Sequence, residues 1–128
     1  MTLTGEMLIG FAAVRGSEGS LAAFNPATHA EIPEPTFGLG GPAEVDRAAR
    51  LADDAFDAYR QAPLSRRASF LEAIADNIVA IGDELLARAH AETGLPMARL
   101  TGERARTVGQ LRPVSYTHLR AHETSLHL

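Results

Sequence analysis

Histidines near the carboxyl end have the spacing that comes closest to a metal site in this sequence. His118 and His122 are four residues apart, about one helical turn, and Glu123 and His127 follow closely. The zinc-binding pattern H-E-x-x-H would need a histidine at position 126, where this sequence has Leu126. On a regular helix His127 would also lie about 180° around the axis from His118, at about 100° per residue. We therefore expect these side chains to form no specific metal site.

A glycine-rich segment at residues 37–43, FGLGGPA, has the outline G-x-G-x-x-A that precedes a helix in dinucleotide-binding folds. That fingerprint needs a buried strand immediately before it. Here the preceding residues include Pro33 and Pro35, and proline cannot occupy a central strand because it lacks an N–H for the ladder. We interpret the segment as a linker into a helix that begins near Pro42, and we predict no cofactor-binding residues in it.

Two groups of charged residues have explanations that we prefer to catalytic ones. The neighbours Asp53 and Asp54 cannot act as a facing acid and base on a helix, because successive helical residues point in different directions. Four arginines near Glu103 make a local basic stripe, but no aromatic residues are interleaved with them and the net charge of the chain is −4, which disfavours nucleic-acid binding. We expect solvation or pairing with a missing neighbour for these four: Arg99, Arg104, Arg106 and Arg112.

The sequence contains no cysteine, which excludes disulfides, thiolate metal sites and cysteine nucleophiles together. With 128 residues, of which 45% are hydrophobic and 22% charged, the chain fits one small soluble domain. No apolar run approaches the roughly 20 residues that a membrane span needs. The apolar run Met7 to Val14 has no Lys or Arg before it, so it is a poor signal peptide, and we expect a cytoplasmic protein without a membrane or nucleic-acid partner.

The element around which these residues are arranged is the segment from Pro63 to Gly94, where apolar residues recur with the period of a helix. Ser65 is a candidate N-cap, and Gly82 followed by Asp83 predicts the end of one helix and the start of another. Gly94 predicts a stop. The expected buried stripe consists of Leu71, Ile74, Ala75, Ile78, Leu85 and Ala89.

Further elements are predicted on both sides of this segment. Residues 43–60 and 97–112 have helical periodicity, and we expect the first of these helices to pack on the organising segment, with Tyr59 in the core. The apolar runs 7–14 and 21–24, with glycines between them, predict one β-hairpin. Asn25-Pro26 predicts a turn, and the two prolines in residues 31–37 predict an extended edge or surface strand.

Several of these segments together resemble the amino-terminal part of an aldehyde dehydrogenase. The resemblance covers about Thr2 to Arg112 and departs at Gly10-Phe11 and at His29, where the family commonly has glycine. Three stretches most resemble the branch that oxidises α-ketoglutaric semialdehyde: GEMLIG at 5–10, FNPAT at 24–28 and RTVGQL at 106–111. The other segments are FDAYR at 56–60, PLSRR at 63–67 and ETGLP at 92–96.

The resemblance implies the α/β aldehyde dehydrogenase fold, of which this chain would be a fragment that is mostly α-helical with a short amino-terminal hairpin. It implies NAD(P)-dependent oxidation of an aldehyde such as α-ketoglutaric semialdehyde to the acid, through a cysteine thiolate and a glutamate that activates water. The catalytic and cofactor-binding parts of the family lie later in a longer chain. We therefore expect residues 1–112 to be inactive alone and to hold no catalytic, cofactor-binding or metal residues.

The same resemblance implies that the exposed helix faces pack on a missing cofactor domain and that the parent enzyme is a homo-oligomer. Glu92 matches the position of a carboxylate associated with a monovalent cation in some members. We prefer a surface role for it, because a glutamate at the end of a helix is more often on the surface than a cation ligand.

The tail, residues 113–128, continues no pattern from upstream, and its stretch SYTHLRAHET resembles translated sequencing-adaptor DNA. Because Pro113 should interrupt the preceding helix, we expect an artefactual, unrelated tail that is disordered or at most a loose helical turn. The alternative to a truncated enzyme is a small helical domain that binds a protein partner through its apolar faces. A reading frame that continues past Arg112 into a cofactor domain would favour the enzyme.

Overall fold

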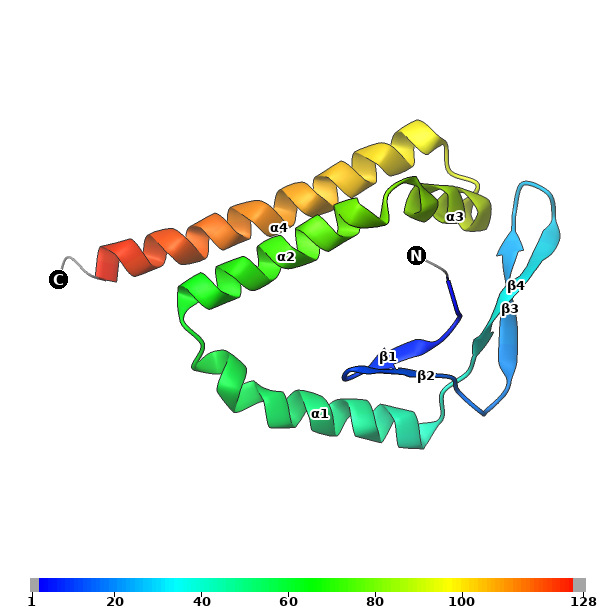
Figure 1. The fold of residues 1–128 in the computed structure, drawn as a ribbon. Coiled ribbons are helices and arrows are strands. Elements are labelled where there is room, and N and C mark those ends of the chain that lie inside the picture. The colour runs from blue at the N-terminus through cyan, green and yellow to red at the C-terminus, as the bar shows by residue number, and fades with distance from the viewer. Residues whose placement is uncertain (1–2, 126–128) are drawn as a thin grey trace. The chain divides into compact units, whose positions relative to one another are not determined.

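The computed structural model describes residues 3–125, apart from the side chains of residue 113 and of residues 118–125 (Figure 1). The chain divides into two compact units, Met1–Arg60 and Gln61–Leu128. The first holds two hairpins and a helix, and the second holds three helices. In the described part of the chain, no helix combines the length and the apolar character that crossing a bilayer requires.

The first hairpin of unit one forms within a single apolar run of the sequence. Strand β1 (Met7–Ile9) pairs antiparallel with β2 (Ala12–Val14) around Gly10 and Phe11. Gly10 has a φ of 63°, a left-handed conformation that glycine adopts without steric cost, so a two-residue turn can form there. The expectation of one hairpin between residues 7–14 and 21–24 is therefore wrong, because the first run folds back on itself.

The second hairpin pairs β3 (Ser20–Asn25) with β4 (Ala30–Gly38). The predicted turn is confirmed: Asn25 Oδ1 accepts hydrogen bonds from the backbone N–H of Ala27 at 2.9 Å and of Thr28 at 3.3 Å. His29, which occupies a position where glycine is common in the resembled family, has a φ of 54°. The turn therefore uses a left-handed residue, and histidine adopts that conformation here at some steric cost.

The prolines of β4 lie where the pairing with β3 is irregular. The register passes from Ala23 opposite Ile32 to Leu21 opposite Phe37, so Pro33 and Pro35 fall in a stretch of β4 without one-to-one partners. Each strand of this two-stranded sheet is an edge strand. The prediction of an edge strand is confirmed, and the irregular register accommodates residues that have no N–H to donate.

Helix α1 (Pro42–Arg60) completes the first unit and contacts β1. No residue of α1 is buried, and Tyr59 is 49% exposed, so the prediction of a core tyrosine is wrong. The amphipathic pattern identified the helix, yet the first unit offers little apolar surface to cover its apolar face. The expected packing of α1 on the organising segment would join the two units and stays a prediction.

The second unit consists of α2 (Leu64–Ile81), α3 (Asp83–Thr93) and α4 (Met97–Ser125). The predicted break at Gly82 is confirmed, with a φ of 71°, and Gly94 ends α3 in the left-handed conformation. Ser65 does not cap α2. It lies inside the first turn, where its carbonyl accepts a hydrogen bond from Ser69 Oγ at 3.1 Å, because the helix already begins after Pro63.

The core of the second unit lies mainly between α2 and α4. Small residues on α2 are almost fully buried there, Ala68 at 1% and Ala75 at 0% exposure. In α3 the buried leucine is Leu86, whereas Leu85 is 36% exposed, contrary to the expected stripe. The break at Gly82 changes the direction of the chain, so a helical period carried across it selects the wrong leucine. Among the side chains of this unit that the structure describes, the other buried ones are Leu100, Val108 and Ser115.

The tail is helical as far as Ser125, because α4 continues through Pro113. The expectation of disorder or a loose turn is therefore wrong for residues 113–125, and residues 126–128 lie outside the described part. A proline inside a helix forfeits the hydrogen bond to the carbonyl four residues earlier and costs about 3 kcal/mol. The helix nevertheless packs beyond the proline: Ser115 is fully buried, with its Oγ 2.9 Å from Glu72 Oε1 on α2 and 2.6 Å from the Arg112 carbonyl oxygen.

Candidate functional site

The basic stripe of α4 begins with a surface cluster around Glu103. Arg106 donates to Glu103 Oε2 from Nε at 2.9 Å and from Nη2 at 2.7 Å, and Arg99 Nε lies 3.4 Å from Glu103 Oε1. The hydrogen bond from Arg106 and its charge hold the pKa of Glu103 below the ordinary value of 4.5, and the charge of Arg99 adds to the effect. These spacings of three and four residues place all three side chains on one helix face, where the carboxylate offsets part of the positive charge of the two arginines.

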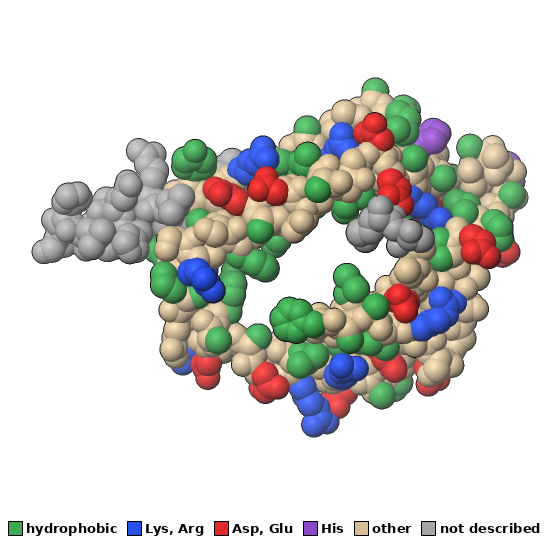
Figure 2. Space-filling model, viewed as in Figure 1, with side chains coloured by type: hydrophobic (Ala, Val, Ile, Leu, Met, Phe, Trp, Pro, Cys, Tyr) green, Lys and Arg blue, Asp and Glu red, His purple; other side chains and the backbone are tan. Residues whose placement is uncertain are grey.

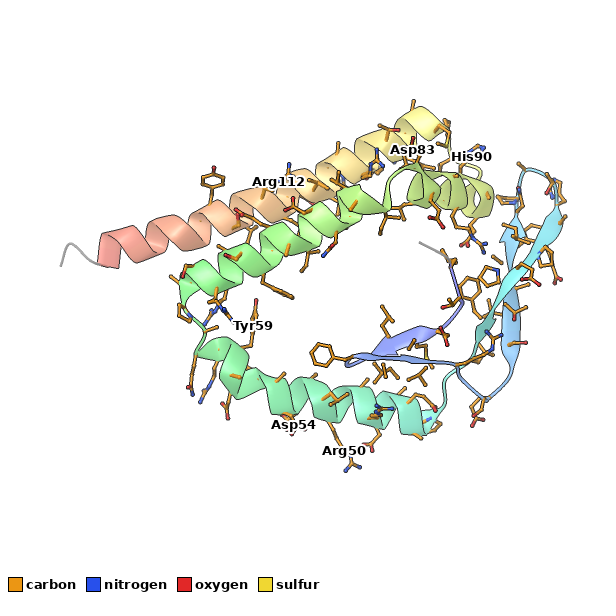
Figure 3. All side chains as sticks on the ribbon, viewed as in Figure 1. Arg50, Asp54, Tyr59, Asp83, His90 and Arg112 are labelled. Carbon is orange, nitrogen blue, oxygen red and sulfur yellow. The ribbon has the colours of Figure 1, made fainter. Side chains whose placement is uncertain are left out.

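The remaining arginines of the stripe join α4 to the helices beside it. Arg104 Nη1 donates to the carbonyl oxygen of Gly82 at 2.9 Å and lies 3.7 Å from Asp83 Oδ1. Arg112 Nη2 donates to Asp76 Oδ1 of α2 at 3.2 Å, and Figure 3 shows Arg112 on the side of α4 that faces α2. We expected solvation or a missing neighbour, but the partners belong to this chain. All four arginines thus have structural partners, which leaves the stripe little charge for a phosphate.

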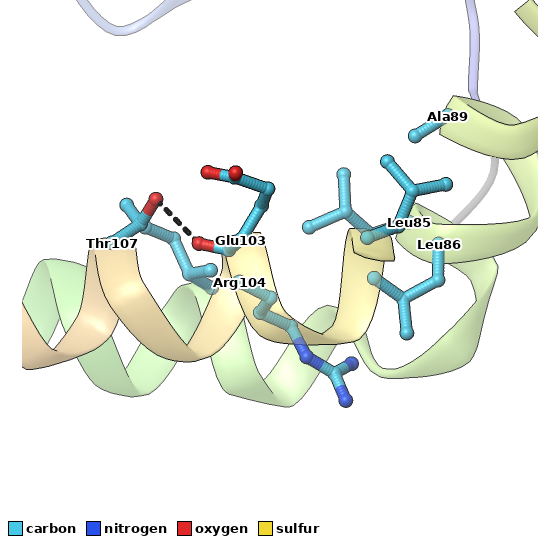
Figure 4. A pocket seen from close by; sticks show the side chains of 8 residues that line it. Leu85, Leu86, Ala89, Glu103, Arg104 and Thr107 are labelled. Carbon is cyan, nitrogen blue, oxygen red and sulfur yellow. Dashed lines mark hydrogen bonds between the residues drawn. The ribbon is translucent and has the colours of Figure 1, made fainter. Parts of the chain in front are cut away.

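An apolar groove of ≈ 280 Å³ lies where α2, α3 and α4 meet (Figure 4). Its polar side chains are engaged within the chain: Thr107 Oγ1 donates to the Glu103 carbonyl oxygen at 3.0 Å, and Arg104 binds Gly82 as described. The surface offered to an occupant is therefore chiefly hydrophobic. The residues that line this groove are Ile78, Leu85, Leu86, Ala89, Leu100, Glu103, Arg104 and Thr107.

A second hollow, of ≈ 790 Å³, lies in the first unit between the β1–β2 hairpin and α1. Its walls include Ile9, Phe11 and Leu51, with Arg47 and Asp54 at the helix side. Ile9 is buried, and the other four of these side chains each expose more than a third of their surface. Charged side chains on such an open surface stay in contact with water. The hollow therefore lacks the desolvated environment that shifts the pKa of a catalytic carboxylate.

The glycine-rich segment does not fit a dinucleotide phosphate loop. A Cβ at Gly38 would lie 2.7 Å from the Gly16 carbonyl oxygen, and one at Gly41 would lie 2.8 Å from Glu18 Cγ, so these glycines make room for the chain itself. The Gly41 N–H, at the start of α1, already donates to Glu44 Oε2 at 2.8 Å. The carboxylates of Glu18 and Glu44, both beside Gly41 at the start of this helix, would repel a pyrophosphate. The geometry agrees with the linker interpretation.

Glu92, the residue matched to a cation-associated carboxylate, forms an ion pair with Arg88 one turn earlier on α3. Its side chain is 37% exposed. A carboxylate satisfied by a guanidinium at the surface is a poor starting point for a cation site, because the cation would have to displace Arg88. In the described part of the chain, no three His, Cys, Asp or Glu residues gather closely enough to hold a metal ion.

The remaining candidates lie apart from one another. Asp53 and Asp54 are exposed on α1, and Figure 3 shows Arg50 and Asp54 projecting from the same side of this helix. The backbone of His118, His122 and Glu123 belongs to α4, but their side chains and the whole of His127 lie outside the described part. The prediction that these histidines hold no specific metal therefore stays a prediction.

The family comparison decides what these elements belong to. The family model described as "Aldehyde dehydrogenase family" matches residues 13–127, which is most of the chain. The chain belongs to the aldehyde dehydrogenase family. The unrelated, artefactual origin expected for residues 113–128 stays a prediction.

Individual aldehyde dehydrogenases resemble this chain over short parts of their own length. Alpha-ketoglutaric semialdehyde dehydrogenase 2 of Azospirillum brasilense is 66% identical over 112 residues, 88% of this chain and 21% of that protein. Alpha-ketoglutaric semialdehyde dehydrogenase of Acinetobacter baylyi is 48% identical over 69 residues, 54% of this chain and 13% of that protein. The chain thus spans about a fifth, or less, of the length of these relatives.

A solved aldehyde dehydrogenase has the same fold in the matching region. The crystal structure of succinate-semialdehyde dehydrogenase from Burkholderia pseudomallei superposes with a TM-score of 0.70 and 29% identity, over 78% of this chain and 20% of that chain. The expected fold, a fragment of the aldehyde dehydrogenase fold that is mainly helical with amino-terminal strands, is therefore confirmed.

Sequence reasoning missed the side chains that hold the second unit together. Arg104 binds a backbone carbonyl 22 residues away, and Ser115 meets Glu72 43 residues away. No short motif announces such contacts, because each depends on how two helices cross.

Proposed function

We propose that this chain is an amino-terminal segment of an NAD(P)-dependent aldehyde dehydrogenase that oxidises a semialdehyde, such as α-ketoglutaric semialdehyde, to the acid. The observation that carries the proposal is the 66% identity over 112 residues to a protein named for that substrate. The chain covers only 21% of that relative, so substrate, cofactor and activity belong to the whole protein. We also propose a cytoplasmic, homo-oligomeric parent.

By itself the chain is inactive in this proposal. Oxidation in this family passes through a covalent intermediate on a cysteine thiolate, and the 128 residues include no cysteine. The glycine-rich segment, as described, does not offer a pyrophosphate cradle. The role of the segment is therefore to contribute strands and helices against which the rest of the enzyme packs.

Exposed apolar side chains support this role. Leu8 is 82% exposed, Phe11 114%, Val45 68% and Phe56 60% in the first unit, and Phe70 is 53% exposed in the second. Figure 2 shows apolar side chains at the surface of each unit. Singly exposed apolar residues are ordinary, but this many large ones on a short chain fit surfaces that the remaining four-fifths of a relative would cover. The alternative of an independent interaction domain explains the same exposure but not the family match.

A chimaeric enzyme tests the claim that this chain is a segment of such a dehydrogenase. Residues 2–112 of this chain would replace the matching part of the Azospirillum brasilense relative, and the purified chimaera would be assayed with α-ketoglutaric semialdehyde and NAD or NADP. We expect a soluble enzyme with activity close to that of the parent relative. As a control, the same graft with Ala75→Leu should lose soluble yield, because the side chain at this position has no exposed surface. A folded, soluble chimaera without activity would contradict the proposal.

The claim that the chain is inactive by itself is tested on the isolated polypeptide. The purified 128-residue polypeptide, incubated with α-ketoglutaric semialdehyde and either nicotinamide cofactor, should give no reduced cofactor above a protein-free blank. Measurable turnover that co-purifies with the polypeptide would show that another nucleophile replaces cysteine. Independent reads of the source DNA that continue past Arg112 into a cofactor domain would support the parent enzyme, and an in-frame stop codon there would favour an independent domain.

A further inference from the structure

We draw no further inference here: the strongest candidate, the apolar groove between α2, α3 and α4 that Leu85 and Leu100 line, is an unpartnered face, and nothing in the structure shows what covers it.

Discussion

At the scale of single residues, the charged side chains of this segment mostly stabilise its own helices. Glu103 accepts hydrogen bonds from one arginine and attracts a second, and Arg104 donates to a carbonyl oxygen at the break between two helices. Interactions of this kind on a surface are individually weak. Arg104 differs from the other arginines of the stripe because its side chain is only 22% exposed. Its partner is the carbonyl oxygen of Gly82 at the carboxyl end of α2, where the helix dipole favours a cation.

Glu103 leads to a prediction about pH. Its folded-state pKa is lowered, so the stability it contributes is present above its unfolded pKa and is lost as the pH falls through the lower folded pKa. Glu103→Gln should therefore be less stable than the unaltered chain near neutral pH, and the difference should shrink as the pH falls below about 4.5. Urea unfolding followed by helical circular dichroism at several pH values would measure it.

Salt provides the control for this prediction. At about 1 M salt the Debye length falls to about 3 Å, so the Coulombic part of the attraction weakens while the hydrogen bond from Arg106 persists. We expect a smaller but measurable difference between Glu103→Gln and the unaltered chain. A difference that stays constant from neutral to acidic pH would mean that the substitution acts through something other than the charge of Glu103.

At the scale of elements, small residues allow α2 and α4 to approach closely. Ala68 and Ala75 are seven residues apart, about two helical turns, and therefore lie on the same face of α2. Both are almost fully shielded from solvent, at 1% and 0% exposure, so a larger side chain at either position would have to displace neighbouring atoms or fill space inside the contact. Volume, more than hydrophobicity, is thus the constraint at this contact.

Ala75→Leu tests that constraint. Forcing a larger side chain into a packed site costs about 1–3 kcal/mol, so the variant should unfold at lower urea concentration than the unaltered chain. Ala80→Leu is the matched control, because Ala80 is an exposed residue of the same helix and should change stability by less than about 0.5 kcal/mol. Equal effects of the two substitutions would show that the α2–α4 contact tolerates added volume.

The portion of α4 beyond Pro113 gives a second prediction for this element. A chain that ends after Arg112 loses the buried Ser115 and its contact with Glu72. Water can then reach Glu72, so the expected cost is the net value of one hydrogen bond, about 0.5–1.5 kcal/mol. A chain that ends after Thr117 keeps Ser115 and should stay close to the full chain. Thermal melting of the three lengths would measure the difference, and identical midpoints would mean that the tail contributes no stability.

The elements also show how far sequence reasoning reaches. Helices α1 to α3, the break at Gly82, the stop at Gly94 and the Asn25 turn follow from local periodicity and from residues with special backbone preferences. The partner of each strand did not follow, because Gly10 was one of several glycines that could have formed the reversing turn. The course of α4 past Pro113 did not follow either, since the contact of Ser115 beyond the proline is with Glu72 of α2, which is distant in sequence.

Some features of the candidate site also followed from the sequence, and others became visible only in the folded chain. The rejection of the glycine-rich segment came from Pro33 and Pro35 alone, and the space around Gly38 and Gly41 agrees with it. The partners of the basic stripe could not be found from the sequence, because Asp76 and Gly82 reach Arg112 and Arg104 only after α2 and α4 are packed side by side. The apolar groove likewise exists only in the packed helices.

At the scale of the whole molecule, large apolar side chains are exposed in both units, among them Phe11 and Phe56 in the first and Phe70 in the second. Surfaces of this kind associate in water, because burying them removes apolar area from the solvent. We expect the isolated chain to form concentration-dependent oligomers in sedimentation velocity experiments. Phe11→Ser, at the fully exposed tip of the first hairpin, should reduce association without loss of helical signal. A monomer at all concentrations with one cooperative thermal transition would contradict this expectation.

The contact at the base of the second hairpin has a consequence for how the sequence can vary in length. The Glu18 N–H donates to the Leu39 carbonyl oxygen at 3.1 Å, and the Leu39 N–H donates to the Gly19 carbonyl oxygen at 2.9 Å. These bonds join the residues just before β3 to the residue just after β4. The Ala27–His29 turn lies at the opposite end of the hairpin from this contact, beyond the Asn25–Ala30 pair, so residues added there leave the contact in place. Each doubling of a flexible loop costs only about 0.6 kcal/mol. The turn is therefore the natural place for insertions, such as a tag or a fluorescent label, whereas the close approach of the backbone at Gly16 and Gly38 leaves no room for a side chain at either glycine.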